Sequence, residues 1–249
     1  MRGERESGRL VAKPFAGRRL IIVLVFVTAL VTFFAFGLDR YLSIDTLRQY
    51  HGTLRAWVET TGVLAALVFM GVYIVTVALS LPGATVLSIA SGFLFGTLWG
   101  MVLVIVSATL GGTALFVIAK TAFGDALRAR AGAWLHTLET GFREHALCYL
   151  LVLRLVPLFP FFVVNLVPAF LGVPLSTFVL GTFVGIIPGS FVYTSVGAGL
   201  GNIFDAGETF SVKGILTPQI VTALVGLAVL ALVPVAYKKI MARRGEGRR

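Results

Sequence analysis

Charged residues divide the chain into four long uncharged blocks. These blocks run over Leu20–Leu38, Thr61–Ala119, Leu155–Phe204 and Gly214–Tyr237. A helix needs about 20 mostly apolar residues to cross a bilayer, so the first and last blocks fit one span each, and the two middle blocks have room for two or more passes. The pattern predicts an all-α polytopic membrane protein with five full spans, at 20–38, 61–81, 98–119, 173–196 and 218–237.

The stretch from Arg154 to Gly172 is apolar but is broken by prolines. Pro157, Pro160 and Pro168 follow Arg154, which is its only charged residue. A proline inside a helix removes a backbone hydrogen bond and clashes one turn back. In a bilayer such breaks survive only where the backbone is buried in protein or lines a wet cavity. We therefore expect a re-entrant hairpin, a segment that enters the membrane, bends and leaves by the same face, with the arginine at its root.

A second punctuated stretch lies at 82–96. Pro82 opens it, small and hydroxyl residues are dense within it, and Gly92 and Gly96 bracket an aromatic pair. The piece is too short to span a bilayer, and we expect two short helices joined at Gly92 to form another re-entrant hairpin. The alternative is one ordinary helix whose glycines allow close packing, because small residues let helices approach closely in lipid.

The two stretches share a layout. Pro82 precedes Gly111 by 29 positions, and Pro160 precedes Gly189 by the same number. Pro188 and Gly189 also interrupt the fourth predicted span. Paired, interrupted apolar segments in two halves of a chain are typical of transporters built from repeats, whose substrate sites lie between the repeats. A chance spacing among the 28 glycines is the alternative explanation.

The segments between the blocks are amphipathic or polar. Residues 39–60 mix apolar and charged groups and suit a helix that lies at the membrane interface. Residues 121–145 carry an apolar stripe at helical spacing with interspersed charges, which indicates a second surface helix. The expected division of the chain is 1–19 and 238–249 as basic cytoplasmic tails, 20–60 as first span and interfacial segment, 61–200 as core, and 201–237 as loop and last span.

The net charge of +10 lies mostly in the two terminal segments. Residues 1–19 carry six basic and two acidic groups, and residues 238–249 carry six and one. Basic flanks of spanning helices mark the cytoplasmic side, so both termini are expected there. Five spans would place the termini on opposite faces. Either one hairpin arm crosses fully, or one tail departs from the charge rule.

Composition excludes several classes of function. Hydrophobic residues make up 57% and charged residues 13% of the chain, against about 25% charged residues in soluble domains. No folded basic module suited to nucleic acid is present. Cys148 is the only cysteine, which excludes an internal disulfide and a cysteine-rich metal site. The three histidines lie in polar segments and no hydrolase motif occurs, so we expect neither an enzyme nor a cofactor.

Arg154 and Asn165 are the candidate substrate-binding residues. A cation at membrane depth costs about 2.5–3.5 kcal/mol even on insertion scales and is by default a functional candidate. A guanidinium can grip a phosphate through two parallel hydrogen bonds. The alternative for Arg154 is an arginine that snorkels to the interface. Asn165 could hydrogen-bond a substrate within the hairpin or cap a broken helix end.

These segments resemble the SNARE-associated Golgi protein family, also called the VTT or DedA-like superfamily. The resemblance covers roughly 60–200. The residues that carry it, or that we expect to shape the two hairpins, are Pro82, Gly92, Gly96, Arg154, Pro157, Pro160, Asn165, Gly172, Pro188 and Gly189. It implies two re-entrant hairpins, each followed by a spanning helix and related by an inverted repeat. It also implies movement of lipids or lipid-linked phosphates between leaflets, or ion-coupled transport.

One departure from the family affects the expected mechanism. Some DedA-like members carry acidic residues in the first hairpin region that are tied to proton coupling, whereas 61–119 has no charge here. We therefore expect a flippase-like or scramblase-like lipid translocase in the plasma (inner) membrane. Its partners would be membrane lipids, either a phospholipid or a polyprenyl phosphate, and no nucleic acid. A non-transporting membrane scaffold or assembly and homeostasis factor is the alternative.

Overall fold

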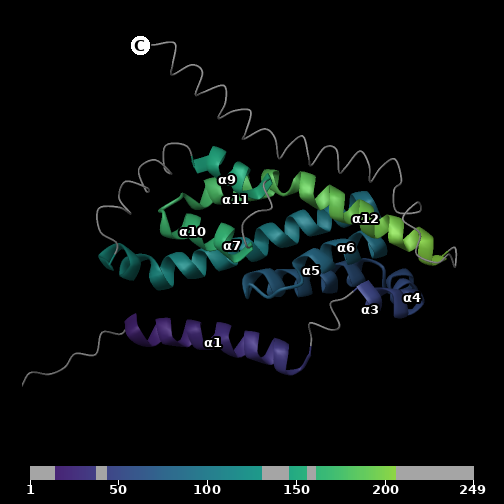
Figure 1. The fold of residues 1–249 in the computed structure, drawn as a ribbon, viewed down its shortest axis with the longest axis horizontal. Helices are drawn as coiled ribbons and strands as arrows, with labels where there is room; N and C mark the ends of the chain where they lie inside the picture. Colours follow the sequence, from purple (N-terminus) through teal and green to yellow (C-terminus); the bar gives the residue numbers. More distant parts are fainter. Residues whose placement is uncertain (1–14, 38–43, 131–145, 156–160, 206–249) are drawn as a thin grey trace, which may run out of the picture.

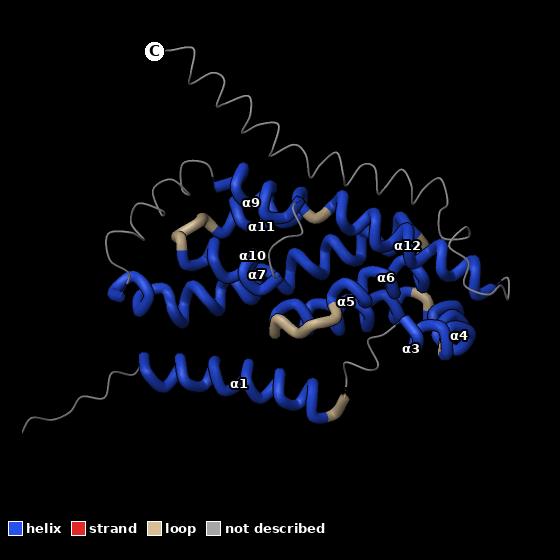
Figure 2. Tube along the Cα trace, in the orientation of Figure 1, coloured by secondary structure: helices blue, strands red, loops and turns tan. Residues whose placement is uncertain are grey.

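The structure is a computed structural model that describes residues 15–37, 44–130, 146–155 and 161–205 (Figure 1). Within these ranges all regular structure is helical and no strand occurs (Figure 2). The all-α class predicted from the sequence is therefore confirmed for the part of the chain that the structure describes.

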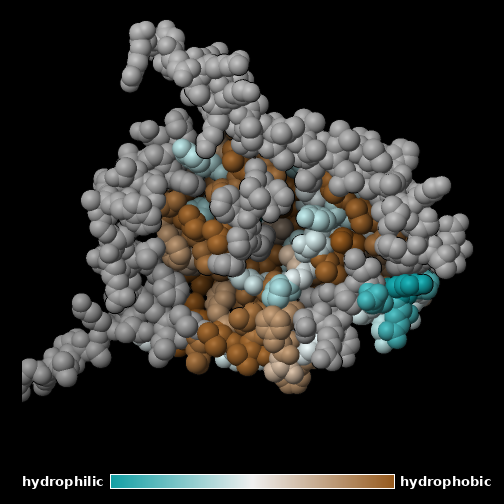
Figure 3. Space-filling model, viewed as in Figure 1, coloured by the Kyte–Doolittle hydropathy of each residue, from teal (hydrophilic) through white to brown (hydrophobic). Residues whose placement is uncertain are grey.

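The N-terminal part contains helices that differ in the polarity of their surfaces. They are α1 (Phe15–Ala35), α3 (Ile44–Gln49), α4 (His51–Thr61) and α5 (Val63–Ala78). Helix α1 exposes large apolar side chains along its length, and its surface is hydrophobic in Figure 3. Helix α4 buries none of its residues and forms the hydrophilic corner of the same view. The chain bends by 118° between α4 and α5, at Gly62, whose φ of 57° suits a residue without a Cβ.

A short buried helix and a long helix follow, α6 (Ala84–Phe95) and α7 (Thr97–Arg130). The 12 residues of α6 extend about 18 Å at 1.5 Å per residue, well short of the roughly 30 Å hydrocarbon core of a bilayer. Gly96 makes the turn between the two helices with a φ of 76°. The predicted punctuation by Pro82 and Gly96 therefore coincides with the two ends of α6.

The predicted turn at Gly92 is wrong. Helix α6 continues through Gly92 without a break, and this glycine is buried. A Cβ at Gly92 would run into the backbone carbonyl of Thr194 on α12 (Ile187–Asp205). The glycine is there because two helices touch through their backbones, which is the close-packing alternative considered for this segment.

The second half has the same order of elements as the first, namely a short helix, a glycine turn and a longer helical run. It contains α9 (Ala146–Leu155), α10 (Phe161–Phe170), α11 (Leu175–Gly185) and α12. Gly172 turns between α10 and α11 with a φ of 71°. Ile186 separates α11 from α12, and Pro188 lies in the first turn of α12, where its missing N–H costs no helical bond. Pro157 and Pro160 lie outside the described residues.

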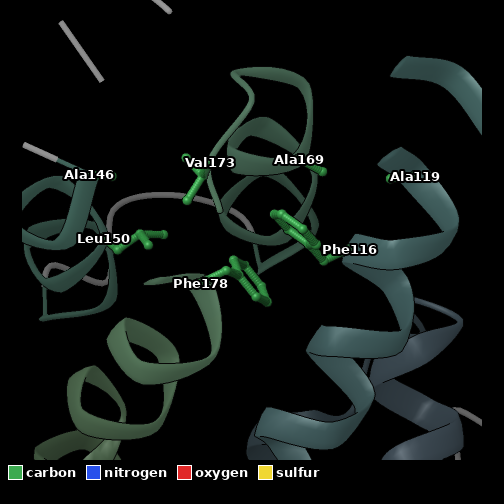
Figure 4. Close-up of a cluster of buried hydrophobic side chains, with 7 residues drawn as sticks. All are labelled: Phe116, Ala119, Ala146, Leu150, Ala169, Val173 and Phe178. Carbon is green, nitrogen blue, oxygen red and sulfur yellow. The ribbon is translucent and has the colours of Figure 1, made fainter. Parts of the chain in front are cut away.

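The two halves pack crosswise. Helix α6 lies against α12, and α10 lies against α7, so each short helix packs on the long helical run of the other half. Within each half the preceding helix packs on the long run, α5 on α7 and α9 on α11. One buried apolar cluster joins α5, α6 and α7. A second joins α7 to α9, α10 and α11 (Figure 4).

Two stretches within the described residues are long and apolar enough to cross a membrane, Thr97–Thr121 and Leu175–Gly201. A third is added if the bent pair of α4 and α5 counts as one span. The predicted total of five full spans is not reached in this part of the chain. The predicted span at 218–237, the C-terminal basic tail at 238–249, residues 1–14 of the N-terminal basic tail and most of the predicted surface helix at 121–145 lie outside the described residues.

Candidate functional site

Small residues on α11 bring α9 close enough to place Arg154 inside the protein. Gly181 and Gly185 lie one turn apart on the face of α11 that meets α9. A Cβ added at Gly181 would lie 3.1 Å from the Cβ of Leu150, and one added at Gly185 would lie 2.8 Å from the Cβ of Arg154. Helix–helix contact in lipid depends on such small residues, so this pair fixes where the stem of the arginine runs.

The guanidinium of Arg154 is anchored to two buried polar side chains. Its Nη2 donates to Oδ1 of Asn165 over 2.6 Å and to Oγ1 of Thr182 over 3.0 Å. Asn165 has no exposed surface and Thr182 is 1% exposed. The head of the arginine is therefore directed into the protein, and the snorkelling alternative does not describe this geometry.

Asn165 lies in the middle of α10, and its side-chain oxygen accepts the bond from Arg154. The alternative role as a cap for a broken helix end is therefore wrong. A Cβ added at Gly112 on α7 would lie 3.2 Å from Oδ1 of Asn165. The absence of a side chain at Gly112 lets α10 approach α7 at the level of the polar cluster.

An aromatic stack separates the polar cluster from the end of the span formed by α7. The rings of Phe116 and Phe178 face each other (Figure 4), with centroids 4.4 Å apart and an interplanar angle of 27°. The guanidinium carbon of Arg154 lies 5.6 Å from the Phe178 ring centroid, and Nζ of Lys120 lies 5.6 Å from the Phe116 ring centroid. Each cation is within cation–π range of one ring.

Arg154 and Lys120 are the only charged residues in 63–121, 146–155 and 161–201. Lys120 is exposed, and its Nζ donates to the Val173 carbonyl over 3.4 Å. A bilayer interior has a low dielectric constant, where a fixed cation attracts an anion far more strongly than it would in water. The cluster of Arg154, Asn165 and Thr182 can therefore orient and stabilise one anionic oxygen group at depth.

The structure brings the two predicted binding residues together. The glycines predicted to shape the hairpins have different surroundings. Arg154 and Asn165 are in direct contact. Gly96 and Gly172 occupy turns, Gly92 is a packing contact, and Gly189 has open space beside it.

Thr182, Gly112 and Gly185 were missed as members of the site. A threonine or a glycine within a long uncharged run carries no local sign of a partner 28 positions away. The spacing of Gly181 and Gly185 was the usable signal, because two small residues four apart predict a close helix contact.

Comparison with known proteins places this site within one domain. Residues 81–199 match the VTT domain family. Human Transmembrane protein 41B is 28% identical over 207 residues, which is 82% of this chain and 69% of the relative. The Xenopus tropicalis protein of that name is 28% identical, covering 82% of this chain and 72% of the relative. The zebrafish protein is 29% identical over 184 residues, covering 72% and 63%. No solved structure gives a significant match.

Proposed function

We propose that this chain, whose residues 81–199 match the VTT domain family and which is similar to Transmembrane protein 41B, moves amphipathic lipids with a phosphate headgroup between membrane leaflets. The matched residues begin just before α6 and end within α12, so they contain both short helices and the arginine cluster. The headgroup of a phospholipid, or of a polyprenyl phosphate, is the anion that Arg154 would hold.

The observation that carries this proposal is the inward guanidinium of Arg154. Its neutral acceptors, Asn165 and Thr182, orient the cation at a position that the sequence surrounds with uncharged residues. A lipid phosphate must lose most of its hydration on the way across a bilayer, and desolvating an anion without a partner costs many kcal/mol. An oriented cation at depth lowers that cost, and the planar guanidinium suits phosphate geometry.

The membrane arrangement that goes with this function is a pair of inverted repeats. The first is α5, α6 and α7, and the second is α9, α10 and α11 with α12. In this proposal α6 and α10 enter the bilayer and return without crossing it. The crosswise packing of α6 on α12 and α10 on α7 supports the arrangement, as do the glycine turns at Gly96 and Gly172.

Reconstitution into phospholipid vesicles tests the function directly. A fluorescent phospholipid is added, and a membrane-impermeant reductant bleaches the outer leaflet, so the remaining fluorescence reports movement between leaflets. We expect Arg154→Ala to slow movement about ten- to a hundredfold, the equivalent of a lost charge-assisted hydrogen bond of about 1.5–3 kcal/mol. Arg154→Lys should be impaired as well, because an ammonium lacks the planar fork.

Arg55→Ala is the matched control for these variants. Arg55 is an exposed arginine on α4, outside the matched domain, and pairs with Glu59 one turn on at 3.8 Å. It should move lipid at the parental rate. All variants are compared at equal reconstituted protein and after gel filtration to confirm folding. If Arg154→Ala matches the parent, the arginine is structural. If the parent itself moves no lipid, the scaffold or assembly role replaces the transport proposal.

Cysteine labelling tests the re-entrant arrangement. In a chain without Cys148, single cysteines along 84–94 and along 160–170 are treated with a membrane-impermeant thiol reagent from either side. Both ends of each segment should label from the face at which that segment enters. Labelling of the two ends from opposite faces would show that the segment spans the bilayer.

The plasma (inner) membrane is the location we propose, on the sequence expectation alone. Fractionation of cells that produce the tagged chain at native level should recover it with plasma-membrane markers. Recovery with another membrane would reject the location and leave the transport proposal intact.

A further inference from the structure

One face of α7 carries a stripe that points at the Arg154 cluster. Thr109, Gly112, Thr113, Phe116 and Lys120 are spaced by one, three or four positions, so they share a face of the helix. Gly112 on this face lies against Asn165 of α10, and Phe116 stacks on Phe178 of α11. The two threonines therefore face the same helices that hold Arg154.

The register between α7 and α11 sets the depth of the two threonines. Lys120 meets Val173, and one turn earlier on α7 Phe116 meets Phe178, so the two helices run antiparallel. Continuing this register brings Thr113 to the level of Thr182 and Thr109 to the level of Gly185. Thr182 accepts the bond from Arg154, and Gly185 contacts the arginine stem.

The hydroxyls of Thr109 and Thr113 are buried and make no hydrogen bond within the described structure. Thr109 is 6% exposed. Several other helical threonines bond the carbonyl four residues earlier, as Thr121 does to Val117 on the same helix and Thr194 does to Ser190. A buried hydroxyl without a partner is destabilising, so two of them on the face toward Arg154 point to a ligand that supplies acceptors.

We propose that Thr109 and Thr113 form the second wall of the Arg154 site and donate hydrogen bonds to the oxygens of the phosphate group that Arg154 holds. This inference rests on the proposed lipid transport. A phosphate diester presents two charged oxygens and two ester oxygens, more acceptors than one guanidinium edge can satisfy. Neutral hydroxyls from α7 supply further donors opposite α9 without adding charge.

Valine substitutions test the hydroxyls because valine keeps the shape of threonine. In the vesicle assay we expect Thr109→Val and Thr113→Val each to slow phospholipid movement roughly three- to tenfold, as expected for one lost hydrogen bond, and the double variant to slow it further. Thr109→Ser and Thr113→Ser keep the hydroxyl and should retain most of the rate.

Ser107→Ala is the matched control. Ser107 is also on α7, is fully buried and has a hydroxyl without a hydrogen bond in the described structure. It shares its face with Gly111, which packs on α5 rather than on the Arg154 cluster. Its removal should leave the rate of lipid movement unchanged.

Thermal stability in detergent supplies a readout apart from transport. Removing an unpartnered buried hydroxyl should leave the melting temperature of the double valine variant unchanged or higher. A short-chain phosphatidylcholine should stabilise the parent more than a matched diacylglycerol that lacks the phosphate. That difference should be smaller in the double variant, which keeps Arg154 but lacks the two hydroxyl donors.

Three results would overturn the inference. The first is a double valine variant at the parental rate while Arg154→Ala is slow, which leaves transport standing and removes the threonines from the site. The second is an equal loss in Ser107→Ala, which assigns the effect to general interior polarity. The third is a fall in melting temperature that accompanies the loss of rate and is not repaired by serine. An unimpaired Arg154→Ala would instead reject the assignment of the arginine itself.

Discussion

At the scale of single residues, the position of Arg154 depends on what is missing beside it. Gly185 leaves room for the arginine stem, and Gly112 leaves room for the amide of Asn165. The cluster therefore depends on two hydrogen bonds and on the absence of a side chain at Gly185 and at Gly112. A side chain added at either glycine would displace the arginine or its partner without removing any group that could contact a lipid.

Gly185→Ala should therefore impair transport indirectly. The added Cβ would lie 2.8 Å from the Cβ of Arg154, closer than real side chains approach, so the stem must shift and its hydrogen bonds must weaken. A displacement of about 1 Å at a reacting or binding group can cost as much as a hundredfold. We expect at least a tenfold slower movement of lipid in vesicles. Gly189→Ala meets open space nearby and should stay close to the parental rate.

Gly92→Ala should instead lower stability. The backbone of Thr194 occupies the position that the new Cβ would take, and a backbone cannot give way as a flexible side chain can. Overpacking of this kind costs about 1–3 kcal/mol or more. The fraction of monodisperse protein after heating in detergent should fall at a lower temperature than for the parent. Gly71→Ala, on α5 with nothing nearby, should melt at or above the parental temperature.

Residue-level chemistry was predictable where the residue is unusual for its surroundings. Arg154 is conspicuous because it begins a long uncharged run, and Asn165 because amides are rare there. Thr182 and the two threonines of α7 are ordinary in composition. Their significance comes from which helix lies opposite, and no pattern within α7 or α11 encodes that register.

At the scale of elements, glycine turns end both short helices. Gly96 after α6 and Gly172 after α10 adopt positive φ angles, a region that costs L-residues with a Cβ roughly 1–2 kcal/mol. The sequence predicted both as the ends of the two punctuated stretches, 82–96 and Arg154–Gly172. Gly92 has the same appearance in sequence but serves a contact 102 positions away. Local pattern does not distinguish a turn glycine from a contact glycine.

The turn role can be separated from packing by a pair of substitutions. Gly96 has open space around it, so Gly96→Ala tests backbone strain alone and should lower the melting temperature in detergent. Gly96→Asn should lower it by a similar amount, because the ψ of 172° at Gly96 lies outside the left-handed helical region that asparagine tolerates. Equal melting temperatures for both variants and the parent would mean that the turn can relax without loss.

At the scale of the whole molecule, the sequence was enough to predict a membrane protein but not how its helices pack against one another. The four uncharged blocks and the basic ends follow from sequence composition, and they suffice to identify a membrane protein. The crosswise packing of α6 on α12 and of α10 on α7 depends on contacts between residues far apart in the chain. The repeat spacing of prolines and glycines indicated that two equivalent halves exist but not which helix each would meet.

Topology offers a test at this scale. Six basic residues in 238–249 predict a cytoplasmic C-terminus by the positive-inside rule. A reporter that is active only in the cytoplasm, fused after Arg249, should be active. A partner reporter that works only on the other side should be silent. The reverse pair of results, at equal expression, would place the C-terminus outside and require a different number of crossings.

The crosswise packing also means that α6 is synthesised well before the helix that covers it. The largest packing surface of α6 is α12, and residues 96–186 must be made between the two helices. At about 5–20 residues per second this takes about 5–20 seconds. During that interval Ile89, Gly92 and Phe93 of α6 lack the helix that later packs against them. The nascent chain must hold a short helix with an uncovered face in or near the bilayer until α12 leaves the ribosome. Any release of the chain before Ile187 leaves the first half permanently without its cover.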